Sequence, residues 1–287
     1  MRNYSFLALL VAIPMLILAA CVAQSSNPAV APKPGFNMFS KQQDIQLGQQ
    51  AAQQVRQQYQ VVQNQTLQDF ATRLGTRLAS QAQAQGYPYS FTMLNSKDVN
   101  AFALPGGPTF VFSQIVLFAD NEAELAGVLA HEISHVALRH GTNQVSKQNL
   151  ISIPAEIAAA TIDGGTMGQL VQLGLGVGLN GLFLHYSRTD ESQADALGTR
   201  IMAEAGYNPI EMANMFEKLA KQGGPGVPEF LSDHPSPGNR VRAVQAIIRT
   251  LPQRSYNYST GEFAKAQQLV KQLPPPPPPK QQPNNGQ

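Results

Sequence analysis

The segment His131-Glu132-Ile133-Ser134-His135 restricts what this chain can fold into more than any other part of its sequence. Asn121-x-x-Glu124 has the pattern of a capping box, which predicts a helix from near Asn121 to about His140, ending at Gly141. Residues four apart share one face of a helix, so the two histidines can bind a single metal ion. Glu132 lies one step around that helix, where its carboxylate can reach a water on the ion without being a ligand. The sequence therefore predicts a metal centre on a helix.

A further ligand must come from another segment, because catalytic zinc usually has three protein ligands and an open position for water. A longer histidine motif would place its third histidine at position 141, where this chain has Gly141. His140 is expected to satisfy carbonyl groups of the last helical turn instead. The candidates for the third ligand are His185, Glu191 and His234.

Glu191 is favoured among these candidates by its surroundings. Asp195 lies four residues later on the same helical face, where it can accept the free ring N–H of a ligating histidine. Ser187-x-x-Asp190 can cap the helix that carries both acids, which is expected to extend through Ala205. Taken alone, Glu191 fits better as an acid that stabilises a helix N-terminus than as a ligand. The residues by themselves leave the third ligand open.

The remaining segments predict an α+β fold, mainly helical, with a small β-sheet beside the motif helix. Strands are expected at Tyr89–Leu94, Asn100–Leu104 and Thr109–Phe112, the last two joined by the turn Pro105-Gly-Gly-Pro108. Helices are expected to begin near Ser40, Thr66 and Pro209, and a last core helix carries Val241, Val244, Ile248 and Leu251. Residues 150–184 are apolar and glycine-rich, and buried or cleft-covering helices are favoured there over a membrane span.

Composition excludes several classes of protein. Lys plus Arg is 20 and Asp plus Glu is 18, and without a basic run this near-neutral balance gives no footprint for nucleic acid. One cysteine permits neither an internal disulfide framework nor a cysteine-rich metal site. That cysteine is Cys21, which follows an apolar run from Phe6 to Ala20.

The N-terminal segment reads as an export signal. The run is short for a membrane span but suits a signal peptide, and Leu18-Ala19-Ala20-Cys21 resembles a bacterial lipobox. We expect residues 1–20 to be removed and Cys21 to carry lipid that holds the protein to a membrane. An ordinary signal peptide or an uncleaved anchor is the alternative. Val22, which is not the Asp that favours inner-membrane retention, points to a periplasmic protein lipid-anchored to the outer membrane.

The mature chain is expected to have three parts. Residues 21–39 form a flexible tether, and residues 40–252 form the domain that holds the metal centre. Residues 253–287 comprise an amphipathic segment near 261–273 and a solvated tail with six consecutive prolines.

Four motifs in order carry a family resemblance. They are the stretch from Asn100 to Gly107, H-E-x-x-H with the following H-V-A-L-R-H-G, Ser187-Arg188-x-x-Glu191-x-Gln193-Ala194-Asp195-x-x-Gly198, and Asp233-His234-Pro235-x-x-x-x-Arg240. Over roughly residues 40–250 the chain resembles the BepA- and LoiP-type periplasmic zinc metalloproteases, relatives of HtpX and of the CAAX prenyl endopeptidases. The resemblance implies a gluzincin-type zincin domain, one Zn²⁺ per chain, and Glu191 as the third ligand beside His131 and His135.

The resemblance also implies a zinc-dependent endopeptidase that hydrolyses unfolded or misassembled envelope proteins. Zinc would activate a water and Glu132 would act as general base. His234, with Arg240 and Tyr186 behind it, is the candidate donor to the oxyanion, or else His234 closes the fourth zinc position in a latent form. The edge formed by Asn100, Ala101, Phe102 and Ala103 could bind an extended substrate. The competing function is a lipoprotein chaperone or assembly factor for outer-membrane proteins that uses the metalloprotease fold for binding.

Overall fold

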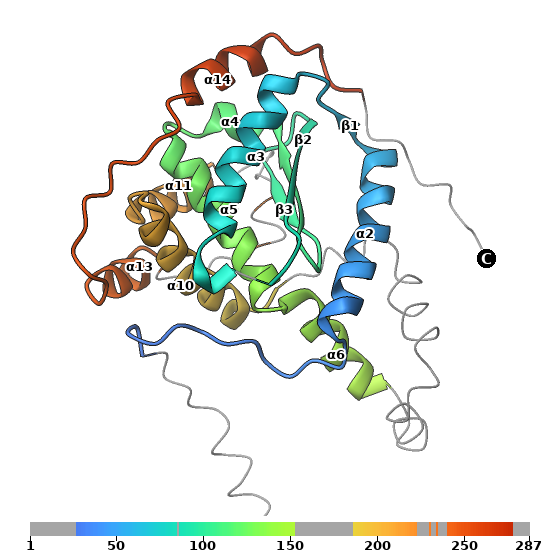
Figure 1. Cartoon of the computed structure of the whole chain (residues 1–287), viewed down its shortest axis with the longest axis vertical. Helices are drawn as coiled ribbons and strands as arrows, with labels where there is room; N and C mark the ends of the chain where they lie inside the picture. The colour runs from blue at the N-terminus through green and yellow to red at the C-terminus, as the bar shows by residue number, and fades with distance from the viewer. Residues whose placement is uncertain are drawn as a thin grey trace, which may run out of the picture.

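The computed structural model describes residues 27–84, 86–152, 186–222, 230, 234 and 240–277, and its described elements confirm the mainly helical α+β fold (Figure 1). Cys21, the predicted signal peptide, most of the apolar segment 150–184, His185 and the end of the proline tail lie outside the described residues. None of the described helices is long and apolar enough to cross a membrane. The described helices are α2 (Lys41–Gln58), α3 (Gln65–Ala79), η1 (Ala82–Ala84), α4 (Ser113–Phe118), α5 (Glu122–Ala137), α6 (His140–Ser152), α10 (Arg188–Ala205), α11 (Ile210–Lys221), α13 (Arg240–Ile248) and α14 (Phe263–Lys271).

Four strands form one mixed sheet, with β1 (Gln60–Val61), β2 (Ser90–Asn95), β3 (Ala101–Ala103) and β4 (Pro108–Phe112) in the order β1-β2-β4-β3. β2 and β4 are parallel, whereas β3 turns back antiparallel to β4 and forms one edge. Gly106 (φ 77°) and Gly107 (φ 118°) make the turn between β3 and β4, in backbone conformations that only glycine adopts readily. The predicted strands are present, and the short β1 was not predicted.

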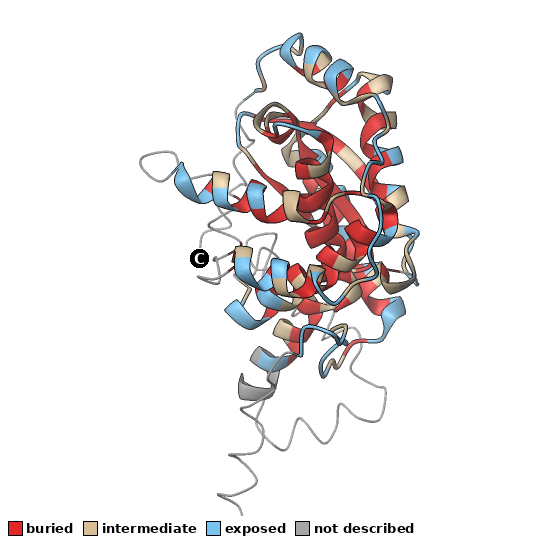
Figure 2. Ribbon diagram, turned by 90° about the vertical axis from the view of Figure 1, so that its left-hand side faces the viewer, coloured by how far each residue is buried: buried red, intermediate tan, exposed pale blue. Residues whose placement is uncertain are grey.

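Both faces of the sheet are covered. Side chains on one face, such as Leu94 and Phe110, pack against Ala51 and Val55 of α2. The opposite face, which includes Met93 and Val111, packs against α3 and α5 in the larger core (Figure 1). Figure 2 shows the buried residues concentrated in the interior, with exposed residues on the outer sides of the helices. The motif helix α5 therefore lies between the sheet and the helices that follow it.

Glycines allow the helices around α5 to approach closely. A Cβ atom built on Gly127 of α5 would lie 2.6 Å from Cα of Met212 in α11. A Cβ atom on Gly198 of α10 would lie 3.2 Å from the Ala130 carbonyl and the His131 nitrogen. α10 therefore crosses α5 at the H-E-x-x-H motif. The close contact of the two backbones fixes the distance between the acids of α10 and the histidines of α5.

The predicted end of the motif helix is wrong. α5 ends at Ala137, and Arg139 takes a left-handed conformation (φ 60°), which breaks the helical hydrogen-bond pattern. The side chain of Arg139 explains why this conformation persists, since it donates to Asp44 of α2 (2.7 Å) and to the Phe39 carbonyl. A separate helix, α6, then begins at His140, so Gly141 is inside a helix and does not terminate one.

The predicted N-terminal caps are present with one difference. Ser40 and Ser187 each form a complete capping box. At α5 only half of the box forms, because Asn121 accepts from the Glu124 N–H (3.0 Å) while the Glu124 carboxylate accepts from the Asp120 N–H (2.8 Å). Asn121 nevertheless starts the helix where the sequence predicts.

Both ends of the described chain pack onto the domain. In the segment before α2, the Asn37 amide donates to Thr142 (2.7 Å) and the Met38 N–H donates to Ser146 (3.0 Å), both on α6. α14 lies in the predicted amphipathic segment and buries Ala266 and Val270 in the main core, next to α3 and α4. The boundary predicted at residue 252 stays a prediction, and the core extends past it.

Candidate metal centre

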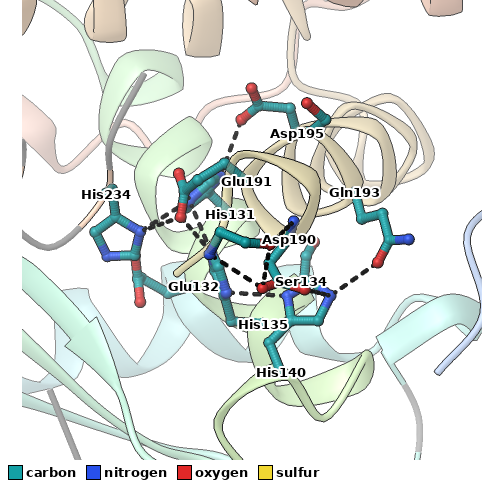
Figure 3. Close-up of polar contacts among 12 residues, drawn as sticks. His131, Glu132, Ser134, His135, His140, Asp190, Glu191, Gln193, Asp195 and His234 are labelled. Atoms are coloured by element: carbon teal, nitrogen blue, oxygen red, sulfur yellow. Dashed lines mark hydrogen bonds and ion pairs between the residues drawn. The ribbon is translucent and has the colours of Figure 1, made fainter. Parts of the chain in front are cut away.

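Four side chains from three segments converge at the centre of the domain (Figure 3). α5 supplies His131 and His135, α10 supplies Glu191, and a third segment supplies His234, which lies next to Glu191 and Glu132. One potential ligand atom of each lies within 4.8 Å of the others, and all four residues are buried. Of the three candidates for a further ligand, the structure brings Glu191 and His234 to the histidine pair, and His185 lies outside the described residues.

The spacing of these atoms fits a tetrahedral metal ion. Ligands 2.0–2.1 Å from a zinc ion at tetrahedral angles are about 3.3 Å apart. The Nε2 atoms of His131 and His135 are 3.0 Å apart, and they lie 3.3 and 3.4 Å from the carboxylate oxygens of Glu191. His234 Nδ1 is 3.2 Å from His131 Nε2 and 3.0 Å from Glu191 Oε1. Two imidazoles and a buried carboxylate are also the chemical types that zinc prefers, so the residues present fit this metal.

A carboxylate and a guanidinium hold His131 in place. Asp195 Oδ1 lies 3.0 Å from Nδ1 of His131, which leaves Nε2 directed at the other ligands. Arg240 donates to both oxygens of Asp195, at 2.7 and 2.8 Å, and to Glu191 Oε2 at 3.2 Å. In the described contacts Arg240 fixes the buried acids, and its predicted role as a donor to the oxyanion stays a prediction.

His140 contradicts the role that the sequence predicted for it. Its ring contacts His135 and not helix-end carbonyls, with Nδ1 3.1 Å from Nδ1 of His135. Its Nε2 lies 3.1 Å from Oε1 of Gln193 on α10 (Figure 3). The prediction failed because it assumed one continuous helix, whereas the break at Arg139 turns His140 back toward His135. Gln193 lies in one of the four family motifs, but its spacing gives no sign of this contact.

Glu132 lies beside the ligands without joining them. Its Oε2 accepts the N–H of Ala103 on β3 (3.0 Å), and its Oε1 lies 3.3 Å from Nε2 of His234. Burial raises the pKa of Glu132, and the neighbouring His234 and His131 oppose that rise. A raised pKa suits a carboxylate that must take up a proton during a reaction.

The acids and histidines of the cluster perturb one another strongly. Burial alone would raise the pKa of Glu191, but His234 and His131 beside it hold that pKa far below its usual range. Burial alone would lower the pKa of His131, but Glu191 and Asp195 raise it to about 9. Burial lowers the pKa of His135. Glu191 therefore remains a carboxylate, available as an anionic ligand.

The predicted substrate edge contacts Glu132 through Ala103. In β3, the N–H groups of Ala101 and Ala103 point away from β4; Ala101 donates to Asn100 Oδ1 (2.8 Å) and Ala103 to Glu132. Asn100, Ala101 and Phe102 are buried. Tyr186 packs its ring on His135, with centroids 3.9 Å apart. Strand addition at this edge stays a prediction.

Comparisons with known proteins agree with this geometry. A sequence model of peptidase family M48 matches residues 63–248. The chain is 30% identical over 229 residues to "Beta-barrel assembly-enhancing protease" of Yersinia pestis, covering 76% of this chain and 46% of that protein. It is 32% identical over 178 residues to "Mitochondrial metalloendopeptidase OMA1" of Schizosaccharomyces pombe, covering 61% of this chain and 51% of that protein. The chain spans about half the length of the curated relatives it matches.

Proposed function

This chain belongs to peptidase family M48, a family of metallopeptidases, and from that premise we propose that it is a zinc-dependent endopeptidase acting on unfolded or misassembled envelope proteins. The observation that carries the proposal is the meeting of two imidazole nitrogens and the Glu191 carboxylate at tetrahedral spacing, with Glu132 beside them. These are the parts that hydrolysis by a metal-activated water requires.

Each residue then has a role in peptide hydrolysis. Bound zinc would lower the pKa of a water and polarise the substrate carbonyl. Glu132 takes the proton of the attacking water and passes it to the leaving amine. Burial raises the pKa of this carboxylate above its ordinary value, which favours its uptake of that proton. Asp195 and Arg240 keep His131 oriented throughout.

His234 has a position that supports a role as fourth ligand in a latent form. Its Nδ1 faces His131 and Glu191, and its Nε2 faces Glu132. If it restrains the site in this way, His234→Ala should retain zinc and hydrolyse peptides faster than the wild type. Slower hydrolysis with full zinc content would assign His234 to the stabilisation of the oxyanion instead.

The substrate class and location rest on the sequence and on the relatives. The name "beta-barrel assembly-enhancing protease" supports substrates among proteins of the bacterial envelope. The lipobox-like segment ending at Cys21 supports a periplasmic protein, lipid-anchored to the outer membrane. An edge strand next to Glu132 suits extended chains, which offer main-chain groups irrespective of their side chains.

The test compares the wild type with Glu132→Gln, which keeps the size of the side chain and removes its basicity. Zinc content should be unchanged, and cleavage of a chemically unfolded, fluorescently labelled protein should fall by about 10²–10⁴-fold. Undiminished cleavage would refute the role of Glu132. The same variant distinguishes the competing function from proteolysis. If the chain is a chaperone or assembly factor, Glu132→Gln should still complement deletion of the gene.

A further inference from the structure

His135 contacts a hydrogen-bonded chain of two side chains, His140 and Gln193, which have no role in the mechanism above. Nδ1 of His135 lies 3.1 Å from Nδ1 of His140, and Nε2 of His140 lies 3.1 Å from Oε1 of Gln193. A second acceptor, Oδ1 of Asp190, lies 3.8 Å from the same Nε2. His135 and His140 are both buried, with exposed fractions of 2% and 3%. Figure 3 shows the chain running from α5 through the first residue of α6 to α10.

The direction of each hydrogen bond follows from the bond that His135 makes to a metal. A metal ion binds His135 only through a bare Nε2, because Nε2 is the atom that faces His131 and Glu191. The ring proton of a neutral His135 must then be on Nδ1, which donates to Nδ1 of His140. His140 must in turn carry its own proton on Nε2, which donates to Gln193. The two oxygen acceptors that face this Nε2 favour that arrangement.

We infer that His140 and Gln193 are positioning residues for the metal centre, which hold His135 in the tautomer that presents a bare Nε2. This inference rests on the proposed function, because it concerns the metal that the proposed reaction uses. His131 is held by a carboxylate with its own arginine, whereas His135 is held by a neutral imidazole and an amide. The two ligands are therefore fixed by separate sets of residues, and either set can be removed alone.

The test uses two pairs of variants that differ in hydrogen-bonding capacity more than in size. His140→Leu removes the acceptor at Nδ1, whereas His140→Asn replaces it with an amide oxygen. Gln193→Met removes the nearer of the two acceptors for Nε2, whereas Gln193→Glu keeps an acceptor at that position. Ser192→Ala, at an exposed position on the same helix, is the control for handling and folding. Zinc affinity is measured by competition with a chelator, and the visible absorption of the Co²⁺-loaded protein reports the geometry of the ligands.

His140→Leu and Gln193→Met should weaken zinc binding about 10–100-fold and alter the cobalt spectrum. His140→Asn and Gln193→Glu should remain within a few-fold of the wild type and keep its spectrum. Equal losses in the two members of a pair would overturn the inference, because packing and not the acceptor would then be the cause. If His140→Leu fails to fold, the Gln193 pair decides, since that side chain is only partly buried.

The outcomes also separate this inference from the proposed function. A wild type that neither binds zinc nor cleaves protein would overturn both. A wild type that binds zinc and cleaves, while all four variants bind zinc equally well, would overturn only the roles of His140 and Gln193.

Discussion

The affinity of the centre for a metal ion should rise with pH between 7 and about 9, because a proton and the metal compete for His131. Glu191 and Asp195 raise the pKa of this buried ring to about 9 in the metal-free protein, against the tendency of burial to lower it. A metal ion binds only the deprotonated nitrogen. At pH 7, two units below that pKa, about one ring in 100 is free, which weakens binding about 100-fold, or about 3 kcal/mol.

A rise in pH should destabilise the metal-free protein and strengthen metal binding. A folded-state pKa raised above the unfolded value stabilises the metal-free protein below pH 6.5, and this contribution is lost as pH rises through about 9. The metal-bound protein should gain affinity over the same interval. Chelator competition at half-unit steps of pH gives the affinity, and calorimetry in two buffers of different ionisation enthalpy counts the protons released.

The count should be close to one proton per metal ion at pH 7 and about half a proton at pH 9. Asp195→Asn is the matched variant, because it removes one of the two groups that raise the pKa of His131. Its affinity should fall about 10–100-fold at pH 9 and depend less on pH below that. An affinity independent of pH, with no proton released by the wild type, would refute the proton competition.

Three further changes test the packing and the charges. Gly127→Ala places a Cβ atom 2.6 Å from Cα of Met212 and should cost about 1–3 kcal/mol of unfolding free energy, measured in urea. Arg240→Met leaves Asp195 and Glu191 without their buried cation, so the metal-free protein should lose about 3–5 kcal/mol, and added zinc should restore part of its thermal midpoint. A chain that ends at residue 260 lacks α14, and exposure of the core beneath Ala266 and Val270 should cost about 2–4 kcal/mol, again measured in urea; an unchanged midpoint would show that α14 is dispensable.

The sequence predicted the parts of the fold that depend on local patterns. Helical spacing and capping residues were sufficient for the start of α5 and α10, and a turn of two glycines was sufficient for β3 and β4. Family membership confirms the resemblance that the motifs indicated. The order of the sheet and the packing of α14 depend on contacts between distant segments, which no local pattern contains.

The break after Ala137 could not be predicted from local sequence patterns. An arginine is an ordinary helix former, and nothing near Arg139 in the sequence signals a left-handed residue. Its conformation depends on Asp44, in a helix far earlier in the chain. The contact of His140 with His135 depends on that break, so it too was missed.

The complete cluster requires α5, α10 and the segment of His234, which are far apart in the chain. Asp195 lies 64 residues beyond His131, and His234 lies a further 43 residues beyond Glu191. A growing or partly folded chain therefore has the two histidines of α5 but not the complete cluster. The peptidase activity proposed above would therefore appear only once these segments have packed together, and copies of this chain that have not folded would be unable to digest one another.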